Sequence, residues 1–292
     1  MLGFRAHDFG KFEETSKLIQ ELNKIHNPTC IQLALNKVFT QYASYEDLSD
    51  EKAISISSEL NKNNIDIAII GSYINPIHPI KEIRELEWKS FESAIKKAKY
   101  LNCPYIGTET GITNLNDEYD IETFNDKNLN IFYNFLDKML ALAIKNDAII
   151  SIEPVSNKHT IASLERTINM IDKFKCDNLK IIYDSVNMMD IKGIKEKDGI
   201  IKKIPSYQAQ KKFHNTILNE IGDSIIALHI KDFKIDNHGN KIGDLPISTG
   251  VMNYKALFDS LKTYNIKAPK ILEMVNIKTL NQIINMLNEL DI

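Results

Sequence analysis

Four ionisable side chains end or interrupt four successive apolar, β-branched segments of this sequence: Glu153, Asp184, His229 and Glu273. A single carboxylate at such a place usually caps a helix or meets solvent, but four in succession indicate a shared site. Three carboxylates brought together without compensation repel one another, which raises their pKa values. A divalent cation removes that cost, and oxygen ligands with one imidazole suit Mn²⁺, Mg²⁺, Co²⁺ or Zn²⁺. We therefore expect a divalent metal site; the alternative is a charge cluster without metal.

Weaker signals mark further candidates near these segments. Lys231 lies two residues after His229, so strand alternation would point both side chains the same way. It would then steady an oxyanion or a phosphate; otherwise it is a solvent-facing lysine. Tyr73 and Asn75 follow the third apolar segment and could bind hydroxyls, although Asn-Pro is also a turn signal. His7, after the first segment, either faces the site or is a hydrogen-bonded loop residue.

The segments that must position these residues alternate between two kinds. Apolar, β-branched segments begin near residues 2, 30, 65, 104, 148, 179, 225 and 270. Helical spacing of apolar residues covers 11–24, 50–63, 80–101, 126–145, 161–174 and 279–290. Alternation of this kind indicates an α/β fold with a parallel sheet, and eight units fit a (β/α)8 TIM barrel. We expect one such domain over residues 1–292; an open sheet with an appended lobe is the alternative.

Two connections are longer than a helix requires. One covers residues 188–207, and the other covers residues 232–248. In a barrel both would lie on the C-terminal face, where the strand ends converge and active-site loops belong. Asp232, which opens the second connection, either orients a ligand or caps the loop.

Composition and charge exclude several classes of protein. The 292 residues carry 36 Lys and Arg against 39 Asp and Glu, so a dedicated nucleic-acid binder is not expected. No run of 18 apolar residues predicts a membrane span, and the first residues lack a secretory pattern. Cys30, Cys103 and Cys176 are odd in number and far apart, which indicates reduced thiols of a cytoplasmic protein. Four other histidines are expected at the surface: His26, His159, His214 and His238.

The order of these motifs resembles the xylose isomerase-like barrel superfamily, which includes sugar isomerases, sugar epimerases and the endonuclease IV type nucleases. The resemblance rests on YINP (73–76), GTETG (107–111), ISIEP (150–154), YDSVN (183–187), LHIKD (228–232) and ILE (271–273). In the epimerase branch one metal ion is held by Glu, Asp, His and Glu from four successive strands. The resemblance implies that Glu153, Asp184, His229 and Glu273 hold one divalent metal ion here.

The same resemblance implies chemistry through an enediolate. The metal would bind a ketose carbonyl and the adjacent hydroxyl, and stabilise the negative charge that develops. Glu153 and Glu273 are the implied catalytic residues, and one of them removes the carbon-bound proton. Return of a proton to the opposite face by the other gives epimerisation, whereas return to the neighbouring carbon gives isomerisation.

Asn187 departs from the family pattern. Family members commonly have a histidine three residues after the strand-six aspartate; it contacts substrate in the epimerases and binds zinc in the nucleases. Asparagine can bond a sugar hydroxyl but is a poor zinc ligand, which disfavours a nuclease with three metals. Glu109 stands near the fourth segment, where the nucleases have a further histidine. We expect Asn187 and Glu109 to contact substrate.

The expected function is that of a divalent-metal-dependent isomerase or epimerase of a small sugar or sugar-like hydroxycarbonyl compound. Two alternatives stay open: a metal-dependent dehydratase of a related keto compound, and a barrel that binds a sugar or a metal without turnover. The expected partner is a small sugar-like substrate, with neither nucleic acid nor membrane. Homo-oligomer formation is left open.

Overall fold

Eight parallel strands close into a barrel in this computed structural model, which describes residues 1–24, 29–116, 119–275 and 279–290. The strands run around the barrel in chain order, and the last pairs with the first. They are β1 Leu2–Arg5, β2 Cys30–Leu33, β3 Asp66–Gly71, β4 Tyr105–Thr108, β5 Ile149–Ile152, β6 Leu179–Asp184, β7 Ile225–Ile230 and β10 Lys270–Leu272. The predicted (β/α)8 TIM barrel is confirmed. The open-sheet alternative is wrong, because the strand order closes on itself.

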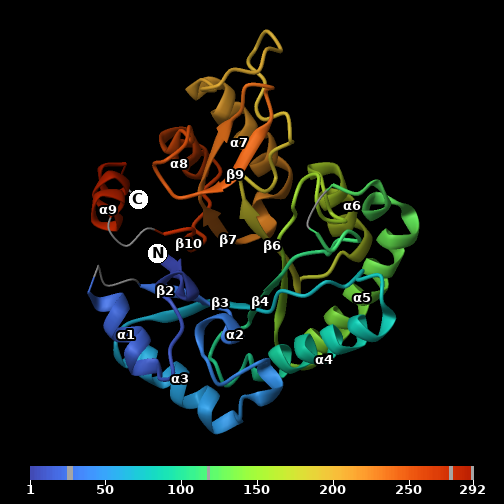
Figure 1. Cartoon of the computed structure of the whole chain (residues 1–292), viewed down its shortest axis with the longest axis vertical. Coiled ribbons are helices and arrows are strands. Elements are labelled where there is room, and N and C mark those ends of the chain that lie inside the picture. The colour runs from blue at the N-terminus through green and yellow to red at the C-terminus, as the bar shows by residue number, and fades with distance from the viewer. Residues whose placement is uncertain (25–28, 117–118, 276–278, 291–292) are drawn as a thin grey trace.

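Helices surround the barrel on its outside (Figure 1). They are α1 Thr15–Asn23, α2 Leu35–Val38, α3 Asp50–Lys62, α4 Lys81–Lys97, α5 Asp126–Lys145, α6 Leu164–Phe174, α7 Tyr207–Ile221, α8 Tyr254–Thr263 and α9 Leu280–Glu289. Side-chain caps fix several starts; Ser49, for example, accepts a hydrogen bond from the first turn of α3. The helix predicted over 80–101 ends at Lys97, because the chain then turns through Asn102, which has a left-handed φ of 52°.

A small apolar layer fills the inside of the barrel. Its buried members come from five strands: Cys30, Ile69, Ile182, Ala227 and Ile271. Side chains alternate along a strand, so the residues two positions further on face the same way, at the C-terminal mouth. These residues are Gln32, Gly71, Asp184, His229 and Glu273. The apolar layer is therefore the floor beneath a layer of polar side chains.

An antiparallel hairpin follows β7 directly. It consists of β8 Asp232–Ile235 and β9 Lys241–Leu245, and β9 is labelled in Figure 1. The sequence predicted a long connection here and no strands, so the hairpin is a correction. Its turn is held by Asp236, whose Oδ1 accepts hydrogen bonds from the N–H groups of His238 and Asn240. In β9 the apolar Ile242 is exposed while Lys241 and Gly243 are half-buried, so the strand lacks the alternation of buried apolar and exposed polar residues that marks a strand in a sequence.

Asp232 anchors the base of this hairpin. Its carboxylate accepts three backbone hydrogen bonds, from Phe233, Gly250 and Met252 at 2.8–2.9 Å, and a fourth from the Tyr254 hydroxyl at 3.0 Å. A Cβ on Gly250 would overlap that carboxylate, so glycine is required for the close approach. Of the two expected roles, Asp232 fills the structural one.

None of the helices in the described ranges combines the length and the hydrophobicity that crossing a membrane requires. Cys30 and Cys103 are buried, Cys176 is partly buried, and all three thiols are free. The prediction of unpaired cysteines is confirmed.

Candidate active site

Four side chains from neighbouring strands meet at the C-terminal mouth of the barrel. Asp184 is the last residue of β6 and His229 the fifth of β7, while Glu153 and Glu273 directly follow β5 and β10. β7 lies between β6 and β10 in the barrel, so His229 stands in the middle of the group. All four side chains belong to residues that are at most 4% exposed. The structure thus brings together the four residues that the sequence singled out as metal ligands.

His229 lies between the two glutamates. Its Nδ1 is 3.1 Å from Glu153 Oε2 and 3.1 Å from Glu273 Oε1. One ligand atom each from Glu153, Asp184 and His229 fall within 4.8 Å of one another. Metal–nitrogen and metal–oxygen bonds of about 2.0–2.2 Å place neighbouring ligands roughly 3 Å apart. The two distances from His229 to the glutamates match that spacing.

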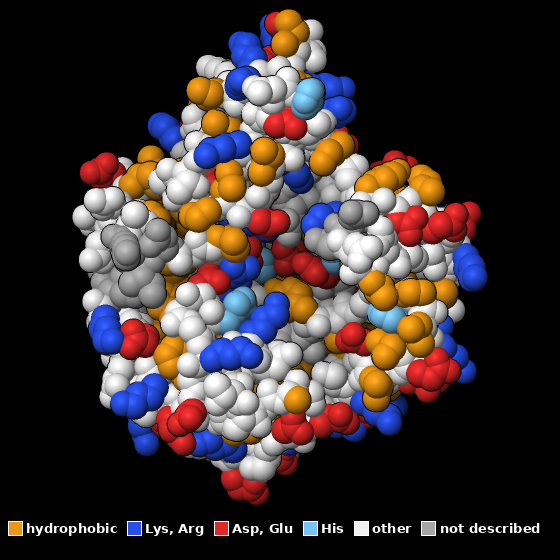
Figure 2. All heavy atoms as spheres, viewed as in Figure 1, with side chains coloured by type: hydrophobic (Ala, Val, Ile, Leu, Met, Phe, Trp, Pro, Cys, Tyr) orange, Lys and Arg blue, Asp and Glu red, His pale blue; other side chains and the backbone are white. Residues whose placement is uncertain are grey.

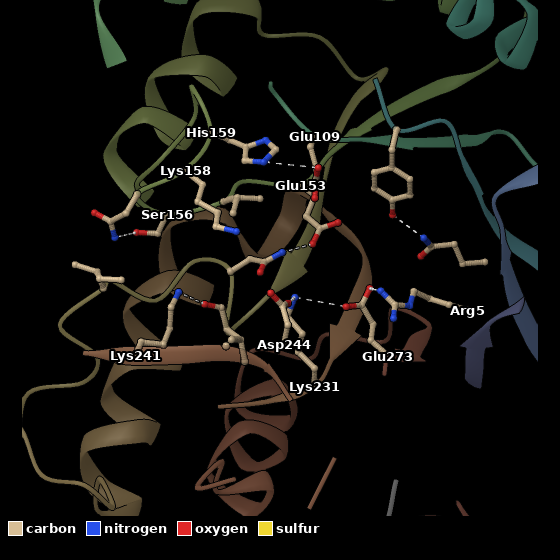
Figure 3. Close-up of a pocket in the computed structure, with 18 of the residues that line it drawn as sticks. Arg5, Glu109, Glu153, Ser156, Lys158, His159, Lys231, Lys241, Asp244 and Glu273 are labelled. Atoms are coloured by element: carbon tan, nitrogen blue, oxygen red, sulfur yellow. Dashed lines mark hydrogen bonds and ion pairs between the residues drawn. The ribbon is translucent and has the colours of Figure 1, made fainter. Parts of the chain in front are cut away.

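Two cations flank the cluster. Lys231 Nζ lies 2.9 Å from Asp184 Oδ2 and 3.5 Å from Glu273 Oε2. Arg5 Nη1 lies 3.4 Å from Glu273 Oε1 (Figure 3). Lys231 is only 3% exposed, so it belongs to the site and is not a solvent-facing lysine.

The buried charges shift one another's pKa values. Burial raises the pKa of Glu153 and that of Asp184 above their ordinary values. Burial acts in the same direction on Glu273, but the positive charges around it, His229 first, outweigh burial and lower its pKa to about 2. Burial lowers the pKa of His229, yet the two glutamates outweigh this and raise it to about 9. The three carboxylates therefore coexist through strong positive compensation.

Two buried atoms of the cluster have charged neighbours but no hydrogen bond. Among the described residues, neither Asp184 Oδ2 nor His229 Nδ1 has a hydrogen-bond partner; Lys231 lies within ion-pair distance of the former, and Glu153 and Glu273 lie within ion-pair distance of the latter. Buried polar atoms nearly always have such a partner. A divalent cation coordinated by both atoms would satisfy them. The donor set therefore fits a divalent metal ion, and by itself it does not choose among Mn²⁺, Mg²⁺, Co²⁺ and Zn²⁺.

A cavity of about 630 Å³ opens above the cluster. Figure 2 shows it as a hollow lined by charged side chains. Glu153, Glu273 and Lys231 line it from the strand ends, and Lys241 and Asp244 line it from the hairpin. A cavity of this size suits a small hydroxylated molecule.

The other predicted substrate-binding residues divide into two groups. Those that line the cavity are His7, Tyr73, Glu109, Asn187 and Lys231. Asn187 Nδ2 donates a hydrogen bond of 2.6 Å to Glu153 Oε1, which orients that carboxylate. Asn75 lies outside the cavity, since its amide exchanges two hydrogen bonds, of 2.9 and 3.1 Å, with the backbone of Ile112. It joins two loops, and its position does not support the predicted contact with substrate.

His159 corrects the expectation that it lies at the surface. It is 8% exposed and lines the cavity. Its Nδ1 accepts a hydrogen bond of 3.2 Å from the N–H of Gly111, and its Nε2 faces Glu109 Oε2 at 3.7 Å (Figure 3). The loop after β5 folds back over the mouth, which no local sequence signal indicates.

Two charged residues of β9, Lys241 and Asp244, also line the cavity and were not among the predicted site residues. Lys241 Nζ donates hydrogen bonds of 2.7 Å to the carbonyls of Val186 and Met189. It thereby clamps the hairpin to the segment that follows Asp184, and burial lowers its pKa to about 8. Asp244 Oδ1 accepts a hydrogen bond of 2.6 Å from Lys231 Nζ.

The remaining histidines differ in their placement. His214, also expected at the surface, is buried on α7, and its Nδ1 lies 2.8 Å from the Tyr183 hydroxyl. His238 is exposed, as predicted. His26 lies outside the described residues.

Three comparisons with known proteins bear on this site. The family profile described as "Xylose isomerase-like TIM barrel" matches residues 26–290. No curated protein sequence matches the chain.

Several solved structures share the fold. 3-Keto-D-glucoside 4-epimerase from E. coli is 13% identical, with a TM-score of 0.70 over 99% of this chain and 98% of that one. D-Psicose 3-epimerase from Clostridium cellulolyticum H10 is 12% identical, with a TM-score of 0.65 over 93% and 83%. The probable 3-DHS dehydratase from Bacillus anthracis is 14% identical, with a TM-score of 0.69 over 98% of each chain. At such low identity these similarities establish the shared fold. Because the family profile spans most of the sequence and the barrel is closed, the chain belongs to the xylose isomerase-like TIM barrel family.

Proposed function

We propose that this protein is a divalent-metal-dependent isomerase or epimerase of a small sugar or sugar-like hydroxycarbonyl compound. The observation that carries the proposal is the buried cluster of Glu153, Asp184 and His229, with Glu273 beside the histidine. The epimerases among the structures of similar fold support the same class of reaction. When bound, the ion would polarise a carbonyl oxygen and stabilise the negative charge that develops there.

Glu153 and Glu273 are the two proton carriers in this proposal. They approach His229 Nδ1 from β5 and β10, strands that β6 and β7 separate in the barrel. One carboxylate removes the carbon-bound proton, which general base catalysis accelerates by about 10²–10⁴-fold. If the other returns a proton to the opposite face, the product is the epimer. If the proton returns to the neighbouring carbon, the product is the isomer.

Other lining residues bind and orient the substrate. The hydrogen bond from Asn187 occupies Glu153 Oε1, so Oε2 is the oxygen that faces His229. Lys231, held by Asp184, supplies a positive charge where an oxyanion develops. His7, Tyr73 and Glu109 offer polar groups to the hydroxyls.

The first test is metal content by elemental analysis after gentle purification. Wild type is expected to retain about one Mn, Co, Mg or Zn per chain, and Glu153→Gln to lose it. Glu46→Gln, at an exposed glutamate, is the matched control and should keep the metal. A panel of ketoses in heavy water, scored for deuterium uptake at carbon, then tests proton abstraction. If wild type retains no metal even after addition of Mn²⁺ or Zn²⁺, the proposal fails.

A dehydratase is the second candidate, favoured by the probable 3-DHS dehydratase of similar fold. Removal of a proton next to a carbonyl begins both reactions, so the same carboxylates serve either one. The two differ in the product, because dehydration lowers the mass by one water and leaves a carbon–carbon double bond. Mass spectrometry of the reaction mixture separates them.

A further inference from the structure

Gln32 is a buried polar side chain that the proposed reaction does not use. It is the third residue of β2, in a strand otherwise made of Cys30, Ile31 and Leu33, and it is 0% exposed. It faces the barrel axis two residues beyond Cys30, a member of the apolar floor. An amide at such a position must find partners for both of its polar atoms.

Both partners of Gln32 lie at the candidate site. Its Oε1 is 2.6 Å from His229 Nε2, and its Nε2 donates a hydrogen bond of 2.6 Å to the Tyr73 hydroxyl. In the barrel, β1 and β10 separate β2 from β7, so the contact with His229 crosses the mouth. Gln32 therefore connects the metal-binding half of the barrel to Tyr73 on the cavity wall.

The contact determines which nitrogen of His229 is available to a metal. An amide oxygen only accepts, so His229 Nε2 carries the proton in this bond. In the neutral imidazole the lone pair is then on Nδ1, the atom that faces Glu153 and Glu273 at 3.1 Å. The reversed amide would put the lone pair on Nε2 and the proton on Nδ1, where the metal must bind. Metal-bound histidines commonly donate their second N–H to a partner that fixes ring and tautomer.

We infer that Gln32 is a positioning residue that holds His229 in the tautomer and ring orientation required for metal binding. This inference rests on the proposed metal-dependent function. The rival explanation is that Gln32 only fills space in the barrel mouth. The two explanations predict different metal affinities for a variant that keeps the shape of the Gln32 side chain but lacks its acceptor oxygen.

The dissociation constant of Mn²⁺ for the full-length protein tests the inference, measured by the electron paramagnetic resonance signal of the free ion. Gln32→Met keeps the size but removes the acceptor, and should weaken Mn²⁺ binding by about 10–100-fold. Gln32→Glu keeps an acceptor at the same place and should bind Mn²⁺ at least as tightly as wild type. Gln210→Met removes a buried glutamine on α7 that bonds backbone groups outside the cluster, and should leave the constant unchanged.

The possible outcomes distinguish failure of this inference from failure of the proposed metal-dependent function. Tight wild-type binding that persists in Gln32→Met would overturn the inference alone. Equal weakening in Gln32→Met and Gln32→Glu would also overturn it, because loss of shape would then be the cause. If Gln32→Met does not fold, weakened binding in Gln32→Glu is still sufficient to reject it. A wild-type protein that binds no Mn²⁺ would overturn the proposed function and this inference with it.

Discussion

Two regions of the molecule line the same cavity and differ in how they are held. The strand-end layer consists of Glu153, Asp184, His229 and Glu273, and its residues are at most 4% exposed. The hairpin rim is residues 232–245, whose Asp244 side chain is 62% exposed. The strand-end layer is fixed by the backbone hydrogen bonds of the barrel. The hairpin rim is fixed to the rest of the molecule by side-chain contacts of Asp232 and Lys241. In barrels of this kind the strand ends carry the chemistry and the loops tune what binds.

Lys231 forms an ion pair with each region, and the two pairs differ in how much they stabilise the protein. It lies 2.9 Å from Asp184, which is buried, and 2.6 Å from Asp244, which is mostly exposed. Solvent screens the second pair, so its contribution to stability is small despite the shorter distance. Removal of Asp184 would instead take away the nearest buried carboxylate of this ammonium and leave Glu273 at 3.5 Å as its buried partner, which is costly.

The largest expected effect comes from Glu273→Gln in the strand-end layer. Loss of a proton carrier should lower turnover by about 10²–10⁴-fold, with the fold retained. The measurement is turnover of the ketose found by deuterium uptake, together with Mn²⁺ affinity. Glu46→Gln, at an exposed site, is the control. Unchanged turnover in Glu273→Gln would show that Glu273 is not a proton carrier. A wild type that binds Mn²⁺ but turns over none of the ketoses would favour a binding barrel over an enzyme.

The second largest effect is expected at Asp232, which anchors the hairpin rim. Asp232→Ala leaves four donors, three of them buried, without their acceptor, and should destabilise the protein by about 3 kcal/mol or more. Thermal or urea unfolding measures this. Asp137→Ala, at an exposed position of α5, should stay within about 0.5 kcal/mol of wild type. Similar small losses in both variants would mean that the hairpin is not held as the structure indicates.

Metal should stabilise the strand-end layer. A ligand that binds only the folded state at about 100 times its dissociation constant adds about 2.7 kcal/mol of stability. Thermal unfolding with Mn²⁺ and after chelation should show this difference in wild type, and Glu153→Gln should show much less. An identical shift in the variant would point to metal bound elsewhere.

Asp244→Asn should have the smallest effect. The pair with Lys231 is largely exposed on the Asp244 side, so stability should change by less than about 1 kcal/mol. Mn²⁺ affinity should be unchanged, while KM for the substrate shifts if the rim contacts it. A large loss of metal affinity would show that the two regions are not separable.

The barrel was predictable because its signals are local. Eight apolar segments, each followed by a helical or a long segment, are read from neighbouring residues alone. The four strand-end residues stood out for the same reason, since each breaks a β-branched run. Gln32 breaks the run of β2 in the same manner and could have been included by that rule.

The loops were not predictable in this way. His159 reaches the cavity because the loop after β5 turns back, and Lys241 reaches it because β8 and β9 pair. Asn75 follows β3 closely in the sequence, which suggested a place at the barrel mouth. In the structure both polar atoms of its amide form hydrogen bonds with the backbone of Ile112. Such outcomes depend on contacts between segments far apart in the chain.

By itself, the sequence determined the α/β alternation and placed ionisable residues at successive strand ends, because side-chain period and strand composition are local properties. Only the tertiary structure decided that Gln32 meets His229 across the mouth and that a hairpin stands at its rim. Those contacts follow from closure of the barrel, which leaves only two strands between β2 and β7 although the two lie far apart in the chain.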